Sequence, residues 1–446
     1  MIDITPFRNR RERLLAQMHA RGGGVALLAT APEQMRSRDS DHPYRHDSHF
    51  YYLTGFTEPE SMLALVAGTD GSRRSVLFCR AKDEAREIWD GHRHGPEAAA
   101  STFGFDQAVP IADVDAHLAD LLADRPALYA PLSTGTPADA PLQRALAALQ
   151  ARARSGVRAP ATRHDLLPLL DEMRLVKDEH EVGTMRRACR ISANAHARAM
   201  RACRPGLREY HLEAELLHEF RAAGAQAPAY NAVVAAGANA CVLHYRAGDA
   251  ALRDGELCLI DAGCELDSYA SDITRTFPIN GRFTAEQRAV YELVLAAQAA
   301  AIDATRPGAA FDAPHEAAVR VLAQGLIDLK LLDGYVDGAV ESGAYRQFYM
   351  HRTSHWLGLD VHDVGDYRDP AAAPTANGRP SRPLEPGMVI TIEPGLYLRP
   401  ASNVPEAFQH IGVRIEDDAL VTPAGVELLS ASAPKHADEI EALMRG

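Results

Sequence analysis

The sequence predicts an α/β (α+β) protein of two domains, the second of which is internally duplicated. Three observations lead to this fold class. The chain has 446 residues, more than one ordinary domain holds. Its first part alternates apolar runs with helical, alanine-rich stretches, which is typical of a layered α/β fold. Its later part contains one helical unit twice, each copy ending at Arg-Pro-Gly.

Residues 1–168 are expected to form the N-terminal domain. Four apolar runs in it predict strands: VALLAT, SMLALVAG, SVLFC and ALYAPL. The stretches ADVDAHLADLLADRP and APLQRALAALQARARSG predict helices. A loop-forming seam at 155–165, with glycine, proline and serine, separates this domain from residues 169–446.

The second domain, residues 169–446, begins with a long helical stretch from residue 171 that ends at Arg204-Pro205-Gly206. A comparable helix ends at Arg306-Pro307-Gly308, and another helical segment follows each triplet. Two helix–RPG–helix units in one half of a chain predict an internal duplication.

Composition restricts the partners and the compartment. The net charge of -13 argues against a nucleic-acid partner, which would need a basic face. No apolar run approaches the ~18 residues of a membrane helix, and the N-terminus becomes charged at once. The six cysteines form no CxxC pair, which argues against disulfides and a thiolate metal site. We therefore expect a cytoplasmic protein without nucleic-acid or membrane partners.

Two aspartates mark the first candidate site. A strand-like run ends on Asp261, turns through Gly263, and is followed by a second run that carries Asp272. This spacing suits a hairpin that brings both carboxylates together, with Asp272, Thr274 and Thr276 on one strand face. Asp261 alone also fits an ordinary turn residue, whereas aspartate within a strand is unusual.

Three histidines follow in the segment YMHRTSHWLGLDVHDVG, namely His351, His355 and His362. The spacing of the first two also suits zinc ligands on one helical turn, but no glutamate follows His351. The segment is more typical of loop and strand than of helix. Single histidines are usually packing or surface residues, and three together beside a tryptophan indicate a site.

Two Glu-Pro-Gly triplets flank the apolar run MVITI. Proline followed by glycine predicts a type II turn and keeps the preceding residue extended. We interpret Glu385, before the run, as a turn residue and Glu393, after it, as a candidate ligand. Farther on, GVRIEDDALV places Arg414 and Glu416 on one strand face by period two, where the pair would be partly buried.

Together these residues predict a metal centre. Four carboxylates and one imidazole would repel one another without cations. Oxygen-rich ligation favours hard or borderline ions such as Mn²⁺. Four carboxylates exceed the needs of one ion, so we expect two divalent ions ~3.5–4 Å apart. Such a pair acidifies a bridging water and polarises a carbonyl for attack.

The same motifs resemble a known family. The order Asp-x10-Asp, His, Glu, Glu, within LIDAGCELDSYASDITRTF, SHWLGLDVHDVG, TIEPGLY and GVRIEDD, resembles the pita-bread metallopeptidases of family M24. Among them it is most similar to the Xaa-Pro aminopeptidases (aminopeptidase P). The stretch SRDSDHPYRHDSHFYYLTGFTEPES resembles their N-terminal domain. The resemblance covers nearly the whole chain and implies a creatinase-like α/β domain followed by a duplicated pita-bread catalytic domain.

The resemblance also implies a metal-ligand set. Asp261 would bind one ion alone, and Asp272 and Glu416 would bridge both ions. His355 and Glu393 would hold the second ion. The family's usual cofactor is Mn²⁺, and Zn²⁺ or Co²⁺ are alternatives.

Further roles follow from the resemblance. His244 and His362 are similar to the substrate-binding and proton-transfer histidines, and His351 to a residue lining the pocket beside the scissile bond. Arg414 is similar to an arginine that braces the bridging glutamate, and Glu393 would shuttle the proton. The implied reaction releases the N-terminal residue from peptides with proline in second position.

Some alternatives stay open at the level of sequence. A prolidase (Xaa-Pro dipeptidase) has the same fold and ligands, and a metal-free creatinase-type hydrolase or an inactive binding module is a more distant possibility. Arg352 stands where glycine commonly follows the first histidine, which affects the expected pocket size. Relatives form homo-dimers or homo-tetramers, and EIWDGHRHG with Trp89 resembles a segment placed near a neighbouring subunit's site.

Overall fold

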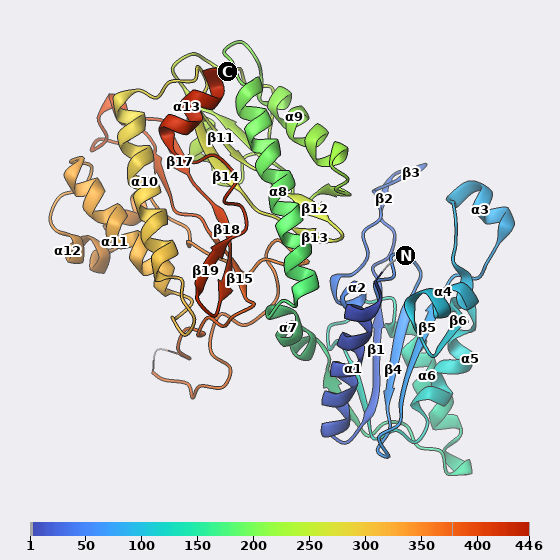
Figure 1. The fold of residues 1–446 in the computed structure, drawn as a ribbon. Coiled ribbons are helices and arrows are strands. Elements are labelled where there is room, and N and C mark those ends of the chain that lie inside the picture. The colour runs from blue at the N-terminus through green and yellow to red at the C-terminus, as the bar shows by residue number, and fades with distance from the viewer. Residues whose placement is uncertain (1–2, 377, 446) are drawn as a thin grey trace. The chain divides into compact units, whose positions relative to one another are not determined.

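The structure is a computed structural model that describes residues 3–376 and 378–445 (Figure 1). The chain forms two compact units, Met1–Arg174 and Leu175–Gly446. Helix α7 (Leu167–Leu175) contains both this division and the domain boundary expected after residue 168.

The first unit is built on a six-stranded mixed sheet in the order β6-β5-β4-β1-β7-β8. β1 pairs antiparallel with β4 and parallel with β7. The strands of this sheet are β1 (Gly24–Ala29), β4 (Met62–Ala67), β5 (Arg73–Cys79), β6 (Gln107–Pro110), β7 (Ala127–Ala130) and β8 (Thr162–Asp165). A separate small hairpin consists of β2 (Met35–Ser37) and β3 (Ser40–Asp41). The helices are α1 (Thr5–Ala20), α2 (Ser48–Thr54), α3 (Glu84–Asp90), α4 (Gly95–Phe103), α5 (Val114–Leu122) and α6 (Asp139–Ala151).

The four predicted strands of this unit are β1, β4, β5 and β7, and the two predicted helices are α5 and α6. The seam at 155–165 is not only loop, because it ends in β8, which pairs parallel with β7. β8 lies at the sheet edge and has the polar sequence TRHD, half of it exposed. An apolar pattern could not reveal such an edge strand.

The long helix predicted from residue 171 is in fact two helices, α7 and α8 (Glu179–Ala202). The Asp178 carboxylate accepts the Glu181 N–H at 2.9 Å, and the Glu181 carboxylate accepts the Asp178 N–H at 3.0 Å. This capping box begins α8. The break is also fixed by a distant contact, since the Lys177 N–H donates to the Gly387 carbonyl at 2.8 Å.

The predicted duplication is confirmed as two helix pairs, each followed by antiparallel strands. α8 packs against α9 (Glu209–Ala222), and α10 (Ala285–Ala304) packs against α11 (Ala313–Asp328). The strands after the first pair are β9 (Ala227–Pro228), β10 (Val233–Ala236), β11 (Leu257–Asp261), β12 (Cys264–Leu266), β13 (Tyr269–Ala270) and β14 (Thr274–Pro278). Those after the second pair are β15 (Val389–Ile392), β16 (Gly395–Leu398), β17 (Ile411–Arg414), β18 (Asp417–Thr422) and β19 (Gly425–Leu428). The remaining helices of this unit are α12 (Val336–Ser342) and α13 (Ala437–Arg445).

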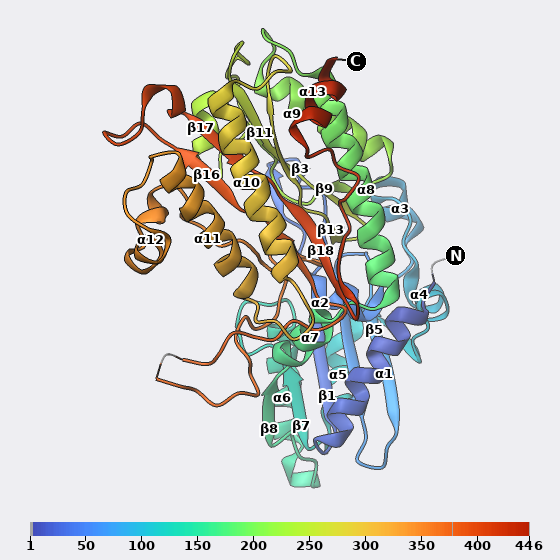
Figure 2. The same ribbon diagram turned by 60° about the vertical axis from the view of Figure 1, so that its left-hand side comes forward.

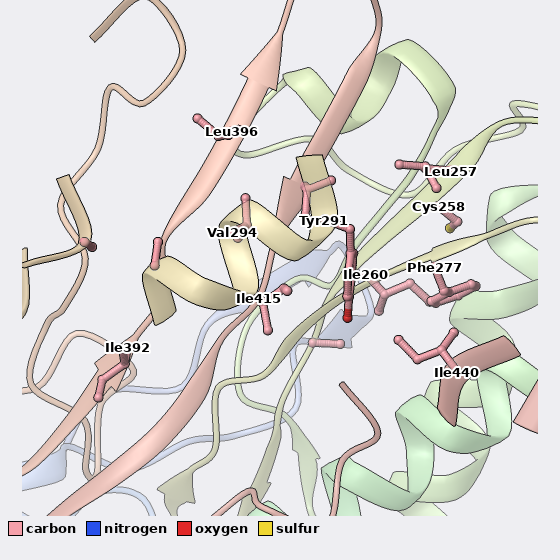
Figure 3. Close-up of a cluster of buried hydrophobic side chains, with 14 of the residues drawn as sticks. Leu257, Cys258, Ile260, Phe277, Tyr291, Val294, Ile392, Leu396, Ile415 and Ile440 are labelled. Carbon is pink, nitrogen blue, oxygen red and sulfur yellow. The ribbon is translucent and has the colours of Figure 1, made fainter. Parts of the chain in front are cut away.

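Both halves of the duplication share one hydrophobic core. Helix α10 packs against β15, β16 and β17 of the later half (Figure 2). Figure 3 shows its Tyr291 and Val294 among Ile260 and Phe277 of the earlier strands and Ile415 after β17. All five side chains are fully buried, and burying each apolar side chain stabilises the fold by roughly 1.5–3 kcal/mol. The core therefore holds the two sets of strands, and the polar groups at their ends, in a fixed relation.

The hairpin expected between Asp261 and Asp272 is more complex than the sequence suggested. A second small hairpin, β12–β13, lies between them, and Asp272 precedes β14 instead of lying within it. A Cβ at Gly263 would fall 1.6 Å from the Ser271 carbonyl oxygen, so only glycine allows the two chain segments to approach there. This close approach brings the two aspartates together.

The two Glu-Pro-Gly triplets differ in conformation. Gly387 has a φ of +95°, as the predicted type II turn requires. Gly395 instead begins β16, so the prediction of a matching turn at the second triplet is wrong. Glu393 lies directly after β15, as expected.

All six cysteines are unpaired and buried. Among the described residues, no helix is both long and apolar enough to span a membrane.

Candidate metal centre

A cavity of about 950 Å³ opens in the second unit. Both halves of the duplication line it. It contains every site residue predicted from the sequence, which are Asp261, Asp272, His244, His351, His355, His362, Glu393, Arg414 and Glu416.

Strand ends position the carboxylates. Asp261 ends β11 and stands opposite Thr274 in the β11–β14 pairing. Glu393 follows β15. Glu416 lies between β17 and β18, so it does not share a strand face with Arg414 as the sequence pattern suggested. Ligand atoms of Asp272, His355 and Glu416 all lie within 4.8 Å of one another, close enough to hold one ion.

The carboxylates are buried with little compensating charge. Burial raises the pKa of Asp261, raises the pKa of Glu416 well above its ordinary value, and raises the pKa of Glu393 to about 7. The Arg414 guanidinium, whose Nη2 donates to Asp261 Oδ2 at 2.6 Å, offsets this negative charge only in part. Carboxylates gathered in this way are typical of a site that binds divalent cations.

His355 has the orientation of a metal ligand. Its Nδ1 lies 2.9 Å from the Trp356 carbonyl oxygen, so Nδ1–H donates there and Nε2 is left for the cavity. Nε2 lies 3.4 Å from Asp272 Oδ2 and 3.6 Å from Glu393 Oε1. Burial lowers the pKa of His355, but the two carboxylates outweigh it and raise that pKa to about 9.

Thr274 and Arg414 brace the cluster. Thr274 Oγ1 donates to Glu416 Oε2 at 2.6 Å and accepts from Arg414 Nε at 3.1 Å. Arg414 therefore reaches the glutamate through the threonine, and its direct carboxylate partner is Asp261. The resemblance implied that Arg414 braces the bridging glutamate, and the hydrogen-bonded link between Arg414 and Glu416 runs through Thr274.

A chain of hydrogen bonds leads from Arg414 to His351. Arg414 Nη1 donates to the Tyr397 hydroxyl at 2.8 Å, and that hydroxyl lies 2.8 Å from His351 Nε2. His351 Nδ1 lies 2.7 Å from the Arg352 carbonyl oxygen, so Nδ1 carries the proton and Nε2 accepts from Tyr397. Burial lowers the pKa of His351 to about 3, which keeps the ring neutral.

Sequence reasoning missed two tyrosines in the site. The Tyr230 hydroxyl contacts both Asp261 and Asp272, and burial raises its pKa well above the ordinary value. Tyr397 connects Arg414 to His351, as described above. Tyr397 stands inside the quoted motif TIEPGLY, but tyrosine is so common in strands that no local signal separates it. Tyr230 lies in the loop between β9 and β10, outside the quoted motifs.

The two remaining histidines, His244 and His362, are exposed residues of the cavity lining. The His362 ring centre is 4.3 Å from that of His355, and burial lowers the pKa of His362. His244 is exposed at the cavity lining. Both rings can therefore present nitrogen atoms to a molecule bound in the cavity.

Comparison with known proteins gives two family matches. The profile of metallopeptidase family M24 matches residues 183–423. The profile of the aminopeptidase P N-terminal domain matches residues 7–129.

Named relatives match over almost the whole chain. The chain is 46% identical to the Xaa-Pro aminopeptidase of Escherichia coli (strain K12), over 98% of this chain and 97% of that protein. It is 33% identical to Xaa-Pro aminopeptidase 3 of Homo sapiens, over 97% of this chain and 84% of that protein.

Solved structures match as closely. Aminopeptidase PepP of Pseudomonas aeruginosa superposes with a TM-score of 0.95 at 50% identity, covering 100% of this chain and 98% of that one. A substrate complex of an Escherichia coli aminopeptidase P variant has a TM-score of 0.95 at 45% identity, with the same coverage.

Proposed function

This chain belongs to metallopeptidase family M24, and from that premise we propose that it releases the N-terminal residue from peptides whose second residue is proline. It is a metal-dependent aminopeptidase, a hydrolase of peptides. The observation that carries the proposal is the set of four carboxylates and His355 that lines one cavity of about 950 Å³, with ligand atoms of Asp272, His355 and Glu416 within 4.8 Å of one another.

We propose that Asp261, Asp272, His355, Glu393 and Glu416 hold two divalent ions. When bound, the ions would acidify the attacking water and polarise the scissile carbonyl. Mn²⁺ is the proposed ion, since the ligand set is rich in oxygen and contains no thiolate.

The chain's own groups would complete the reaction. Glu393 is placed to accept a proton from the attacking water and to return it to the leaving nitrogen. His244 and His362, which line the same cavity, would donate hydrogen bonds to the substrate carbonyl oxygen as negative charge develops on it. Arg414 and Tyr397 hold His351 in one tautomer beside Glu393, whose Oε2 lies 3.9 Å from His351 Nδ1.

The proposal extends to the compartment and the oligomeric state of the enzyme. Six unpaired, buried cysteines favour a reducing compartment, so we propose a cytoplasmic enzyme. We also propose a homo-dimer or homo-tetramer, because Trp89 and Ile88 on α3 are more than four-fifths exposed and would be covered by a second copy.

The decisive test compares peptide length. The purified protein, loaded with Mn²⁺, is offered a longer Xaa-Pro peptide and the matching Xaa-Pro dipeptide, and product release is followed by mass spectrometry. We expect cleavage of the longer peptide. Cleavage of the dipeptide alone would identify a prolidase.

The ligand assignment has its own test. Asp272→Asn and Glu416→Gln are each expected to lower bound metal below stoichiometry and to reduce kcat by about 1000-fold or more, while unfolding stays cooperative. Metal is counted by mass spectrometry and folding is followed by circular dichroism. Asp267→Asn, an exposed aspartate of the β12–β13 hairpin, is the matched control. Full metal content in either ligand variant contradicts the bridging assignment.

A further inference from the structure

Three charged residues form a rim at the lining of the metal-centre cavity. They are Asp312, Arg352 and Arg368. Arg352 Nη2 donates to Asp312 Oδ1, and Arg368 Nη1 donates to Asp312 Oδ2 at 2.9 Å. We call this group the cationic rim, because two guanidinium groups share one carboxylate and leave an excess positive charge.

We propose that the cationic rim binds the C-terminal carboxylate of short peptide substrates and makes the enzyme prefer Xaa-Pro-Xaa tripeptides with a free C-terminus over their amides. This inference rests on the proposed function and adds a substrate class to it. Three features of the cationic rim support this inference: the fold anchors it, its guanidinium groups have unused N–H donors, and it lines the same cavity as the proposed metal ligands.

The rim is held in place by the fold. The Asp312 N–H donates to Ser381 Oγ at 3.0 Å at the start of α11. Arg368 is bridged to the same Ser381 through backbone pairing. Arg352 follows His351, whose ring is fixed beside Glu393. The two guanidinium groups and the Asp312 carboxylate therefore start from three backbone positions that tertiary contacts define.

The two arginines retain donors for a ligand. Their side chains are 57% and 54% exposed, whereas that of Asp312 is 19% exposed. Each guanidinium has five N–H groups in a planar fork, and one from each is bonded to Asp312. Such a fork matches a carboxylate in two parallel bonds, which a peptide amide cannot reproduce.

The location also fits a tripeptide. Its terminal carboxylate lies two residues beyond the scissile bond, about 7 Å along an extended chain. Arg352 is adjacent in sequence to a histidine 3.9 Å from the proposed proton carrier Glu393, and all of them line one cavity. The rim and the proposed metal ligands thus line the same cavity, as the binding of one short peptide by both requires.

The experiment measures kcat and KM for one Xaa-Pro-Xaa tripeptide and for the same tripeptide amide. The wild-type enzyme is expected to show a KM about threefold to tenfold lower for the acid, with a smaller difference at ~0.5 M salt, since the rim is exposed. Equal KM values for the two substrates would refute the rim proposal and leave the proposed function intact. Cleavage of neither peptide would refute the proposed function itself.

Two variants that should change the preference for the acid in opposite directions distinguish carboxylate binding by the rim from a purely structural role of the rim. Arg352→Gln removes a donor and a positive charge, so the preference for the acid should fall to about one- to twofold. Asp312→Asn removes the only negative charge of the rim, so the preference should rise. Arg320→Gln, an exposed arginine of α11 paired with Asp337, is the matched control. An equal loss toward acid and amide in both rim variants would mean that the rim only supports the loop.

Discussion

Gly395 shows how a missing side chain shapes this site. A Cβ there would lie 2.8 Å from the Tyr397 hydroxyl and 2.8 Å from the Val413 carbonyl oxygen. Gly395 stands opposite Arg414 in the β16–β17 pairing, so its empty position is where the tyrosine hydroxyl meets the guanidinium. Glycine is needed here for space.

We therefore expect Gly395→Ala to displace the Tyr397 hydroxyl and to lower kcat by about tenfold or more, because His351 loses its fixed partner. Some stability should be lost as well, roughly 1–3 kcal/mol, since one contact is with backbone. Activity assays and thermal unfolding measure both effects.

Tyr397→Phe is the companion variant, because it removes the hydroxyl without adding volume at residue 395. It should reproduce the loss of kcat with less loss of stability. Wild-type kcat in Tyr397→Phe would mean that the hydrogen-bond chain has no part in turnover.

Among single residues, the sequence predicted the candidate ligands that the structure gathers in one cavity, but it did not predict the threonine and tyrosine side chains that hydrogen-bond to them. Asp272 stood out because the sequence placed it within a strand, where aspartate is depleted, although it lies just before β14. His355 stood out because it is one of three clustered histidines. Thr274 and Tyr397 do not stand out, since both residue types are common in strands. Their importance comes from side chains 17 to 142 positions away in the chain, which no local pattern encodes.

Among the elements, α8 depends on its cap. The Asp178 and Glu181 box satisfies two backbone N–H groups that the first helical turn would otherwise leave unpaired. Asp178→Ala should cost about 1 kcal/mol, seen as a decrease of about 2 °C in the unfolding midpoint of the second unit.

Asn194→Ala provides the comparison for that experiment. Asn194 is exposed in the middle of α8, where alanine is the better helix former, so its midpoint should stay equal or rise slightly. A midpoint for Asp178→Ala that equals that of Asn194→Ala would contradict a stabilising cap.

The sequence correctly predicted the helices whose apolar period extends over many residues. It missed the elements whose boundaries are fixed by contacts with residues far away in the chain. The paired helices α8–α9 and α10–α11 follow from apolar spacing and from the glycine and proline that stop them. The break before Asp178 and the edge strand β8 were missed. Each is set partly by a partner far away in the chain, Gly387 in one case and β7 in the other.

At the scale of the whole molecule, removal of the metal ions should change the stability of the fold through the uncompensated charges of the ligand cluster. Without cations the cluster holds Glu393 with a pKa of about 7 and His355 with a pKa of about 9, both above their ordinary values. The folded state then binds more protons than the unfolded state between about pH 4.5 and 9. Stability of the chelated protein should therefore fall as the pH rises through that window.

The measurement is differential scanning fluorimetry with and without chelator at pH 6 and pH 8. We expect chelation to lower the unfolding midpoint more at pH 8 than at pH 6. Glu416→Gln, which removes one of the crowded negative charges, should reduce this pH dependence. A chelator effect that is larger at pH 6 would contradict the electrostatic account.

The length of the whole chain predicted more than one unit, and the structure has two. The pairing of strand ends from the two halves could not be predicted in the same way. It depends on how α10 and the strands share one core, which is a property of packing in three dimensions.

The two Glu-Pro-Gly triplets around β15 have a consequence for how the sequence can drift. At Gly387 two requirements meet, because its φ is +95° and an added Cβ would lie 2.8 Å from Val176 Cγ1 and 3.2 Å from the Lys177 carbonyl oxygen. At Gly395 the requirement is vacant volume alone. Any exchange of the first glycine must therefore satisfy both an angle and a space, whereas the second needs only space, so identical letters eight positions apart are under selection for different reasons.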